Sequence, residues 1–298
     1  MLKGNSLYRS GIIMSVGAAL LWSSGGLGIR LVDAGPWCIV FWRSLFMALT
    51  VLTYLLLRYR SGSLKVFWRI GWEGIAVGGC LAAAFTFYVM AIVHTAVANA
   101  LIFQGTAPFF AALFGWWFLR ERVSGVSFLL IGVAIGGVAV MFSGSVGSAM
   151  AIGDLFGLGI ALALSASIVI VRATRKINMV PAACIGGAIS ALVALALSGG
   201  IAIALDDLAI LALLGVFQLG IAFCLFLSGS RHLPPSESSL ITLLETVIGP
   251  LLVWIAIGES PTMRALIGGV VIVIALVVHS VFLSRAPRAS SSEAGTQS

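Results

Sequence analysis

The sequence predicts an all-α integral membrane protein whose ten transmembrane helices form two inverted five-helix repeats. Three observations lead to this fold class: the composition, ten long apolar segments, and the uneven distribution of basic residues between those segments. Of the 298 residues, 60% are hydrophobic and 9% are charged, whereas soluble domains carry about 45–50% apolar and about 25% charged residues. Water would not cover so apolar a surface, which excludes a large soluble enzyme and a disordered protein.

Ten apolar segments reach the length of about 20 residues that a helix needs to cross a bilayer with its backbone hydrogen-bonded internally. The first is too long for a signal-peptide core of about 7–15 residues, so we expect it to remain as a helix. The third and fourth follow one another closely and could also be divided differently. The expected spans are residues 11–31, 36–57, 71–93, 96–118, 124–142, 151–171, 181–203, 208–229, 238–257 and 265–284.

Lys and Arg residues gather on one side of these spans. With the N-terminus inside, the cytoplasmic segments receive 14 of the 17 basic residues, and only Arg30 and Arg264 fall outside. The external loops instead carry acidic residues, namely Asp33, Asp154, Asp206, Asp207 and Glu259. The positive-inside rule predicts this asymmetry for an even number of spans with both termini cytoplasmic. It also accounts for the net charge of +7 without a nucleic-acid partner.

The chain carries signs of an internal duplication. An offset of 138 residues aligns His94 with His232, Trp116 with Trp254 and Glu121 with Glu259, and an offset of 142 aligns Gly17, Ser23 and Arg30 with Gly159, Ser165 and Arg172. A Ser/Gly-rich linker at residues 143–148 falls between the halves. We therefore expect repeats at residues 1–147 and 148–284, and a disordered cytoplasmic tail at residues 285–298. Since each half has five spans, the two must insert with opposite topology, a construction typical of secondary transporters.

These features, over about residues 11–284, resemble the drug/metabolite transporter superfamily in its bacterial EamA-type branch. The residues that carry the resemblance are Trp22, Pro36 with Arg43, Ala107-Pro108 with Glu121, and Glu245 with Gly258-Glu259. Two departures are Arg120, where the pattern favours Gly, and Thr246, where Pro is frequent. The resemblance implies export of amino acids or other small metabolites across the bacterial inner membrane. The chain is most similar to aromatic amino-acid exporters of bacteria.

Glu245 and Arg43 are charged residues away from the ends of predicted spans, where each costs about 2.5–3.5 kcal/mol to insert. Glu245, near the middle of the ninth span, is expected either to meet a substrate ammonium or a proton, or to bond structurally to a neighbouring helix. Arg43, in the second span, could receive a substrate carboxylate through two parallel N–H donors. The alternative is a structural Arg that pairs with a carboxylate or reaches the membrane surface.

Backbone interruptions give an independent indication of a site. The fourth span has Gly105 and Pro108 at its centre, the ninth has Gly249 and Pro250, and the first has a Ser-Ser-Gly-Gly run at residues 23–26. Interrupted spans at corresponding positions of two repeats favour a transporter site, because freed backbone groups can face a substrate. Close helix packing is the alternative explanation for these small residues.

Polar and aromatic side chains near these breaks make up the predicted substrate site. They suit a small zwitterion with an apolar or aromatic side chain, although lipid-facing placement competes for each aromatic residue. The predicted substrate-binding residues are Trp22, Ser23, Arg43, Phe85, Tyr88, Asn99, Gln104, Ser165, Gln218, Thr242, Glu245 and Trp254.

Other classes of function find little support in the sequence. It contains no Walker A, G-x-S-x-G or H-E-x-x-H motif, no C-x-x-C pair and no repeated pore filter, so an enzyme or a channel is the weaker hypothesis. We expect no catalytic residue, metal or cofactor. We expect a small-molecule substrate and the lipid bilayer as partners, with a monomer as the working state. Import, or transport of another metabolite or drug class, remains the alternative.

Overall fold

The computed structural model describes residues 2–121, 123–174 and 179–285, and every regular element in this part of the chain is a helix. The predicted repeat of residues 1–147 holds α1 (Leu2–Ser23), α2 (Gly25–Arg30), α3 (Pro36–Tyr59), η1 (Arg60–Gly62), α4 (Ser63–Arg69), α5 (Gly71–His94), α6 (Val97–Gly105), α7 (Ala107–Leu119) and α8 (Gly125–Ser143). The following part holds α9 (Met150–Ala173), α10 (Val180–Leu197), α11 (Leu205–Leu213), η2 (Leu214–Ile221), α12 (Ala222–Ser230), α13 (Pro235–Ile257) and α14 (Met263–Arg285). The predicted tail lies, apart from its first residue, outside the described residues.

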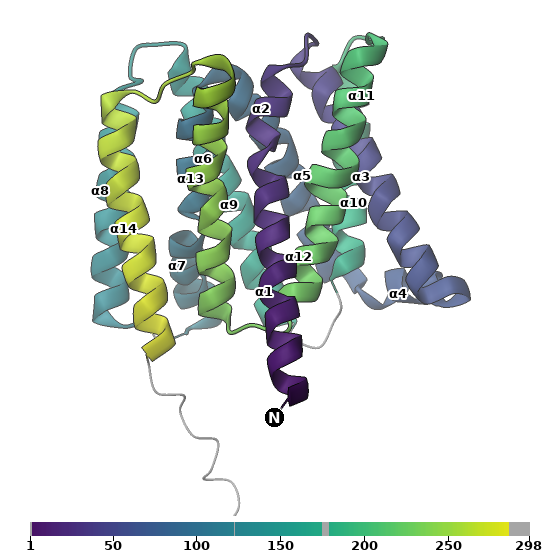
Figure 1. Cartoon of the computed structure of the whole chain (residues 1–298), viewed down its shortest axis with the longest axis horizontal. Helices are drawn as coiled ribbons and strands as arrows, with labels where there is room; N and C mark the ends of the chain where they lie inside the picture. Colours follow the sequence, from purple (N-terminus) through teal and green to yellow (C-terminus); the bar gives the residue numbers. More distant parts are fainter. Residues whose placement is uncertain (1, 122, 175–178, 286–298) are drawn as a thin grey trace, which may run out of the picture.

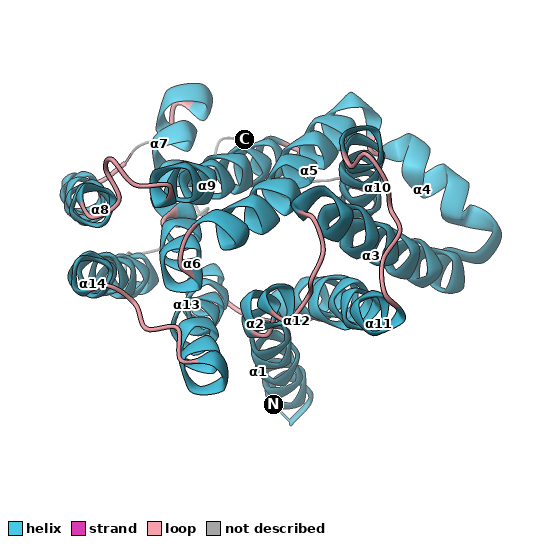
Figure 2. Ribbon diagram, turned by 90° about the horizontal axis from the view of Figure 1, so that it is seen from above, coloured by secondary structure: helices cyan, strands magenta, loops and turns pink. Residues whose placement is uncertain are grey.

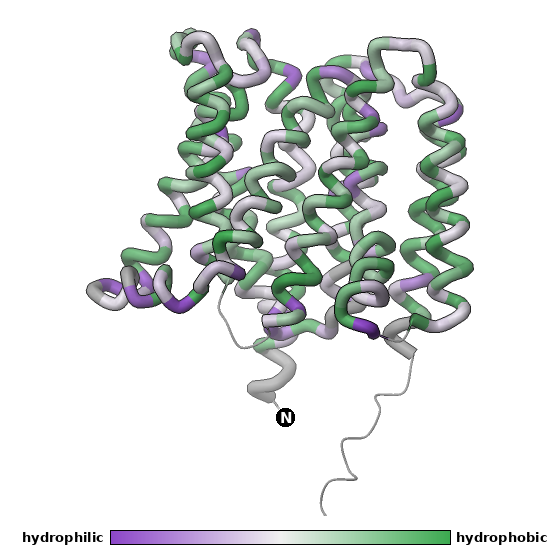
Figure 3. Tube along the Cα trace, turned by 180° about the vertical axis from the view of Figure 1, so that it is seen from behind, coloured by the Kyte–Doolittle hydropathy of each residue, from purple (hydrophilic) through white to green (hydrophobic). Residues whose placement is uncertain are grey.

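Ten helical segments in the described part of the chain are long and apolar enough to cross a membrane, as predicted. Three spans are composite: α1 with α2, α6 with α7, and α11 with η2 and α12. The third and fourth spans divide at Thr95, where the backbone is extended before α6 begins. Figure 3 shows the apolar residues along the middle of the bundle and hydrophilic ones near its two ends.

The two repeats enter the bundle from opposite faces. The N-terminus, the α7–α8 turn and the end of α14 lie at one face, which we call the terminal face (Figure 1). The turns after α2, α8 and α13 lie at the other, the distal face. Because the first repeat starts at the terminal face and the second at the distal face, the predicted inverted two-repeat fold is confirmed.

The repeats are packed crosswise. The first span of each repeat packs against the third and fourth spans of the other: α1 against α12 and α13, and α9 against α5, α6 and α7. The fifth spans, α8 and α14, lie side by side at one edge of the bundle (Figure 2). The centre of the bundle is therefore surrounded by helices of both repeats.

Helix interruptions cluster at mid-bundle. The predicted breaks are confirmed between α1 and α2 at Ser24 and between α6 and α7 at Thr106. At each break the hydroxyl adds a second hydrogen bond to a carbonyl that already accepts the backbone N–H of the same residue, from Ser24 to Leu21 O at 2.7 Å and from Thr106 to Phe103 O at 2.6 Å. At the third predicted position α13 continues through Pro250. Interrupted backbone at this depth is tolerated only where protein or a water-filled cavity surrounds it.

The eighth span contains an interruption that the sequence pattern did not reveal. Residues Leu214–Ile221 form a π-helix, a rare winding that is frequent at functional sites. Gln218, at 3% exposure, lies within it.

Candidate substrate-binding site

Arg43 forms the centre of a buried polar group at mid-bundle. Its side chain is only 2% exposed, and its Nη2 donates to Gln218 Oε1 at 2.9 Å. Its guanidinium carbon lies 4.8 Å from the ring centroid of Tyr88, within the range of a cation–π contact. These three residues come from α3, η2 and α5, so spans of both repeats hold the cation in place.

Part of the donor capacity of this group is unused. Among the described residues, Arg43 Nε, Arg43 Nη1 and the Tyr88 hydroxyl have no hydrogen-bond partner, although all three are buried. A buried donor without a partner costs about 1–3 kcal/mol, and more when it is charged. Such a set of donors is suited to an anionic acceptor such as a carboxylate.

The break between α1 and α2 brings the backbone of the first span against this group. A Cβ added at Gly25 would lie 2.7 Å from both Gln218 Nε2 and the Tyr88 hydroxyl, so only glycine allows so close an approach. Gln218 Nε2 also donates to the carbonyl of Trp22 at 3.3 Å. The half-buried Trp22 ring lies 5.2 Å from that of Phe226, with the planes tilted by 53°.

A second polar group joins the fourth and ninth spans, in which Pro108 and Pro250 mark predicted helix breaks. Glu245, 7% exposed on α13, accepts a hydrogen bond from Gln104 Nε2 of α6 at 3.2 Å. No ion pair with Glu245 occurs among the described residues. Arg43 and Glu245 are thus a buried guanidinium and a buried carboxylate on different helices, α3 and α13.

Six of the twelve predicted site residues therefore belong to these two groups, namely Trp22, Arg43, Tyr88, Gln104, Gln218 and Glu245. Ser23 and Ser165 lie close to the helix breaks, but each donates to a carbonyl of its own helix. Ser165 also contacts the carbonyl of Ala107, at 2.7 Å, where α7 begins. These serines support the breaks.

The other predicted residues lie elsewhere or are less engaged. Phe85 packs into an aliphatic cluster with residues of α3 and α10, and Thr242 is half-buried on α13. Trp254 is 54% exposed near the distal end of α13. We leave Phe85 and Trp254 out of the proposed site, because neither side chain is placed in the two polar groups.

Asn99 belongs to a separate cluster near the distal face. There Asp154 accepts hydrogen bonds from Thr95 Oγ1 at 2.6 Å, from Asn99 Nδ2 at 3.1 Å and from Ser145 Oγ. The expectation that Asp154 lies in an external loop is wrong, because the residue is fully buried in α9. Three hydroxyl or amide donors from other segments replace water around this carboxylate.

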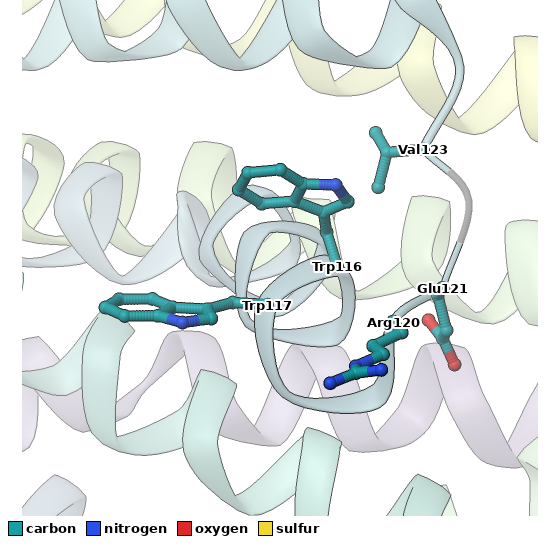
Figure 4. Close-up of a pocket in the computed structure, with 5 residues that line it drawn as sticks. All are labelled: Trp116, Trp117, Arg120, Glu121 and Val123. Carbon is teal, nitrogen blue, oxygen red and sulfur yellow. The ribbon is translucent and has the colours of Figure 1, made fainter.

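A surface hollow of about 550 Å³ lies at the terminal end of α7, away from the polar centre. It is lined by Trp116, Trp117, Arg120, Glu121 and Val123, and Figure 4 shows the two indole rings on one side and the two charged side chains on another. The sequence marked Glu121 by the repeat alignment and by the family resemblance but assigned it no function. In the structure Glu121 forms an ion pair with Arg172.

The described residues thus form a multi-pass helical bundle of two inverted repeats with buried polar groups at its centre. The family model of the EamA-like transporter family matches the chain twice, over residues 9–143 and 151–281. The chain therefore belongs to the EamA-like transporter family, whose members are transporters.

Individual relatives agree with this class. The chain is 29% identical over 287 residues to a Pseudomonas aeruginosa protein named pseudopaline exporter CntI, covering 92% of this chain and 97% of that protein. It is 24% identical over 222 residues to an uncharacterized transporter of Clostridium kluyveri, covering 69% and 71% of the two chains. One crystal structure matches with a TM-score of 0.66 at 21% identity over 94% of this chain and 99% of the other. That last likeness concerns the fold alone.

Proposed function

We propose that this protein exports a small zwitterionic metabolite, an amino acid or an amino-acid derivative, across the bacterial inner membrane by alternating access between its two repeats. The observation that carries this proposal is the buried Arg43 guanidinium with two unpartnered N–H groups beside an unpartnered Tyr88 hydroxyl. The excess of basic residues on the side of the termini supports a cytoplasmic terminal face.

In the proposed complex the substrate carboxylate accepts hydrogen bonds from the Tyr88 hydroxyl and from one unpartnered nitrogen of Arg43, either Nε or Nη1. Such a charge-assisted hydrogen bond from a guanidinium to a carboxylate is about twice as strong as a neutral one. The substrate ammonium faces Glu245, whose position Gln104 fixes. An oriented pair of opposite charges selects a zwitterion over a simple amine or acid, because either partial analogue leaves one buried charge unmatched.

The side-chain preference of the site is the finer part of the proposal. Trp22 and Tyr88 supply ring surface next to the polar groups, which favours apolar and aromatic amino acids. The relative named for pseudopaline export supports outward transport of a small metabolite. Import of the same substrates is the competing hypothesis.

Counterflow in proteoliposomes tests the recognition of both charges. We expect phenylalanine to compete with labelled substrate, and phenylalanine amide and 3-phenylpropionate, which each lack one charge, to compete at least about tenfold more weakly. Arg43→Lys keeps the cation but loses the planar guanidinium with its fixed donors, so it should weaken phenylalanine binding while leaving competition by the amide nearly unchanged. Equal competition by phenylalanine and its amide in the wild-type protein would contradict the role of Arg43.

A further inference from the structure

The described residues form two ion pairs, one at each face of the bundle. At the distal face, Arg30 Nε lies 2.9 Å from Glu259 Oε2. At the terminal face, Arg172 Nη1 lies 3.3 Å from Glu121 Oε2. We call the first pair the distal lock and the second the terminal lock.

The two locks are related by the internal duplication. Arg172 follows Arg30 by 142 residues and Glu259 follows Glu121 by 138 residues, the same offsets that align the repeats. Each arginine comes from the first span of one repeat and each glutamate from just beyond the fourth span of the other. The inversion of the repeats then puts one lock on each side of the membrane. In two unrelated surface pairs, the arginines and the glutamates would not be related by the two offsets that align the repeats.

Each lock crosses an interface that alternating access has to open. The first span of each repeat packs against the fourth span of the other, and the locks join the ends of these spans. Access from one face requires separation of the helix ends there, while the opposite ends stay together. Both locks are formed in this structure, so neither face is released.

The distal lock has the more extensive support. Glu259 Oε1 accepts a hydrogen bond of 2.7 Å from the backbone N–H of Val97, in the first turn of α6. Arg30 Nη2 donates to the carbonyl of Thr95 at 2.9 Å, and the hydroxyl of Thr95 is itself held by Asp154. Both charged residues are thus anchored to the turn between the third and fourth spans.

Among the described residues, the terminal lock has no hydrogen bond that corresponds to the one from the Val97 N–H. The 138-residue offset places Pro235 opposite Val97, and proline has no N–H. The terminal side chains are also more exposed, 43% and 35% for Arg172 and Glu121 against 27% and 23% for Arg30 and Glu259. Exposed pairs are weakened by water and salt, whereas hydrogen bonds from backbone amides to a carboxylate are comparatively strong.

We propose that the two ion pairs are alternate locks of the transport cycle and that their unequal strength makes the empty carrier open first at the terminal face. Arg30, Glu259, Arg172 and Glu121 are positioning residues that hold helix ends and do not touch the substrate. A carrier with the cytoplasmic orientation proposed above then loads from the cytoplasm. The direction of opening rests on the structure alone, and only its meaning for export rests on the proposed function.

Cysteine labelling of the substrate-free carrier tests the proposal. In a background without the four native cysteines, Ala96→Cys reports on the distal face and Leu233→Cys on the terminal face, because both positions are buried. We expect Glu259→Gln to raise the rate at which a membrane-impermeant maleimide modifies Cys at position 96 by at least about tenfold. The matched Glu121→Gln should raise modification at position 233 by no more than about fivefold.

A variant that should strengthen the terminal lock tests directly whether the two locks differ in strength. Pro235→Ala supplies the missing N–H, so it should slow modification at position 233, while Pro234→Ala, one residue out of register, should not. Equal effects of the two glutamine variants, or faster modification at both faces in either one, would overturn the proposal. So would an unchanged modification rate in Pro235→Ala.

Labelling of empty carrier needs no substrate, so the two proposals can fail separately. If the glutamine variants change labelling as expected but amino acids show no counterflow, the proposed substrate is wrong and the lock proposal stands. If amino acids show counterflow but the glutamine variants leave the labelling rates unchanged, the lock proposal is wrong and the proposed substrate stands.

Discussion

At Arg43, contacts with Gln218 and Tyr88 hold a guanidinium in the apolar centre while leaving two of its N–H groups unused. A purely structural arginine would be expected to donate these hydrogen bonds to protein acceptors, because buried polar groups nearly always have hydrogen-bond partners. Glu245, which is also buried, accepts a hydrogen bond from the Gln104 amide and has no ion-pair partner among the described residues. The proposed zwitterionic substrate would supply a partner of opposite charge to each of the two residues.

Glu245→Gln should impair transport without loss of folded protein. The amide keeps the size of the side chain and can still accept from Gln104, but it cannot neutralise an ammonium group. We expect the half-saturating concentration for phenylalanine to rise at least about tenfold in counterflow. The apparent melting temperature in detergent should stay at or above that of the wild-type protein, because a buried charge is removed. Glu245→Asp, which keeps the charge, is the control, and wild-type kinetics in Glu245→Gln would exclude the residue from the site.

At the scale of the element, the fourth spans of the two repeats end in the same backbone conformation but with different residues. Both α7 and α13 end on a left-handed residue, Arg120 with φ of 54° and Gly258 with φ of 72°. These residues are related by the 138-residue offset, and each precedes a lock glutamate. Glycine adopts this conformation freely, whereas a residue with a Cβ is strained there.

Arg120→Gly should therefore stabilise the protein. Relief of the left-handed strain is worth up to about 1–2 kcal/mol, reduced by the greater freedom of glycine in the unfolded chain. Thermal unfolding in detergent, followed by tryptophan fluorescence, measures the effect. Leu119→Gly is the control, since a glycine one residue earlier, inside the helix, should lower the melting temperature instead. A lower melting temperature in Arg120→Gly would show that the Arg120 side chain contributes more than its backbone costs.

At the scale of the whole molecule, the first span of each repeat packs against the third and fourth spans of the other repeat. A substrate that binds Arg43 and Glu245 as proposed would contact helices of both repeats. Substrate binding should therefore stabilise the assembled bundle, because a ligand that binds only the native state shifts the unfolding equilibrium.

A thermal-shift titration checks this linkage. Phenylalanine at about 100 times its dissociation constant should stabilise the protein by about 2.7 kcal/mol, whereas 3-phenylpropionate at equal concentration should not. Arg43→Gln should abolish the shift while still unfolding cooperatively. An equal shift with both compounds would indicate that the ammonium group is not recognised.

The span count, the composite breaks at Ser24 and Thr106 and the inverted duplication follow from the sequence, because each depends on local apolar length, on Gly and Pro, or on residue spacing. The same is true of the nomination of Arg43, Tyr88, Gln218 and Glu245, since polar groups in an apolar span need a reason to be there. Only the tertiary structure shows which of these residues contact one another. It also shows that Trp254 is exposed on the outer surface of the bundle.

Only the tertiary structure could pair Arg30 with Glu259 and Arg172 with Glu121. The alignment marks these residues as equivalent, but it does not state that each partner belongs to the opposite repeat. That exchange arises from the crosswise packing of the first spans, which depends on contacts between residues more than 50 positions apart in the chain. Apolar length fixes how many helices cross the membrane, while the fit between distant helix faces decides which charges meet at their ends.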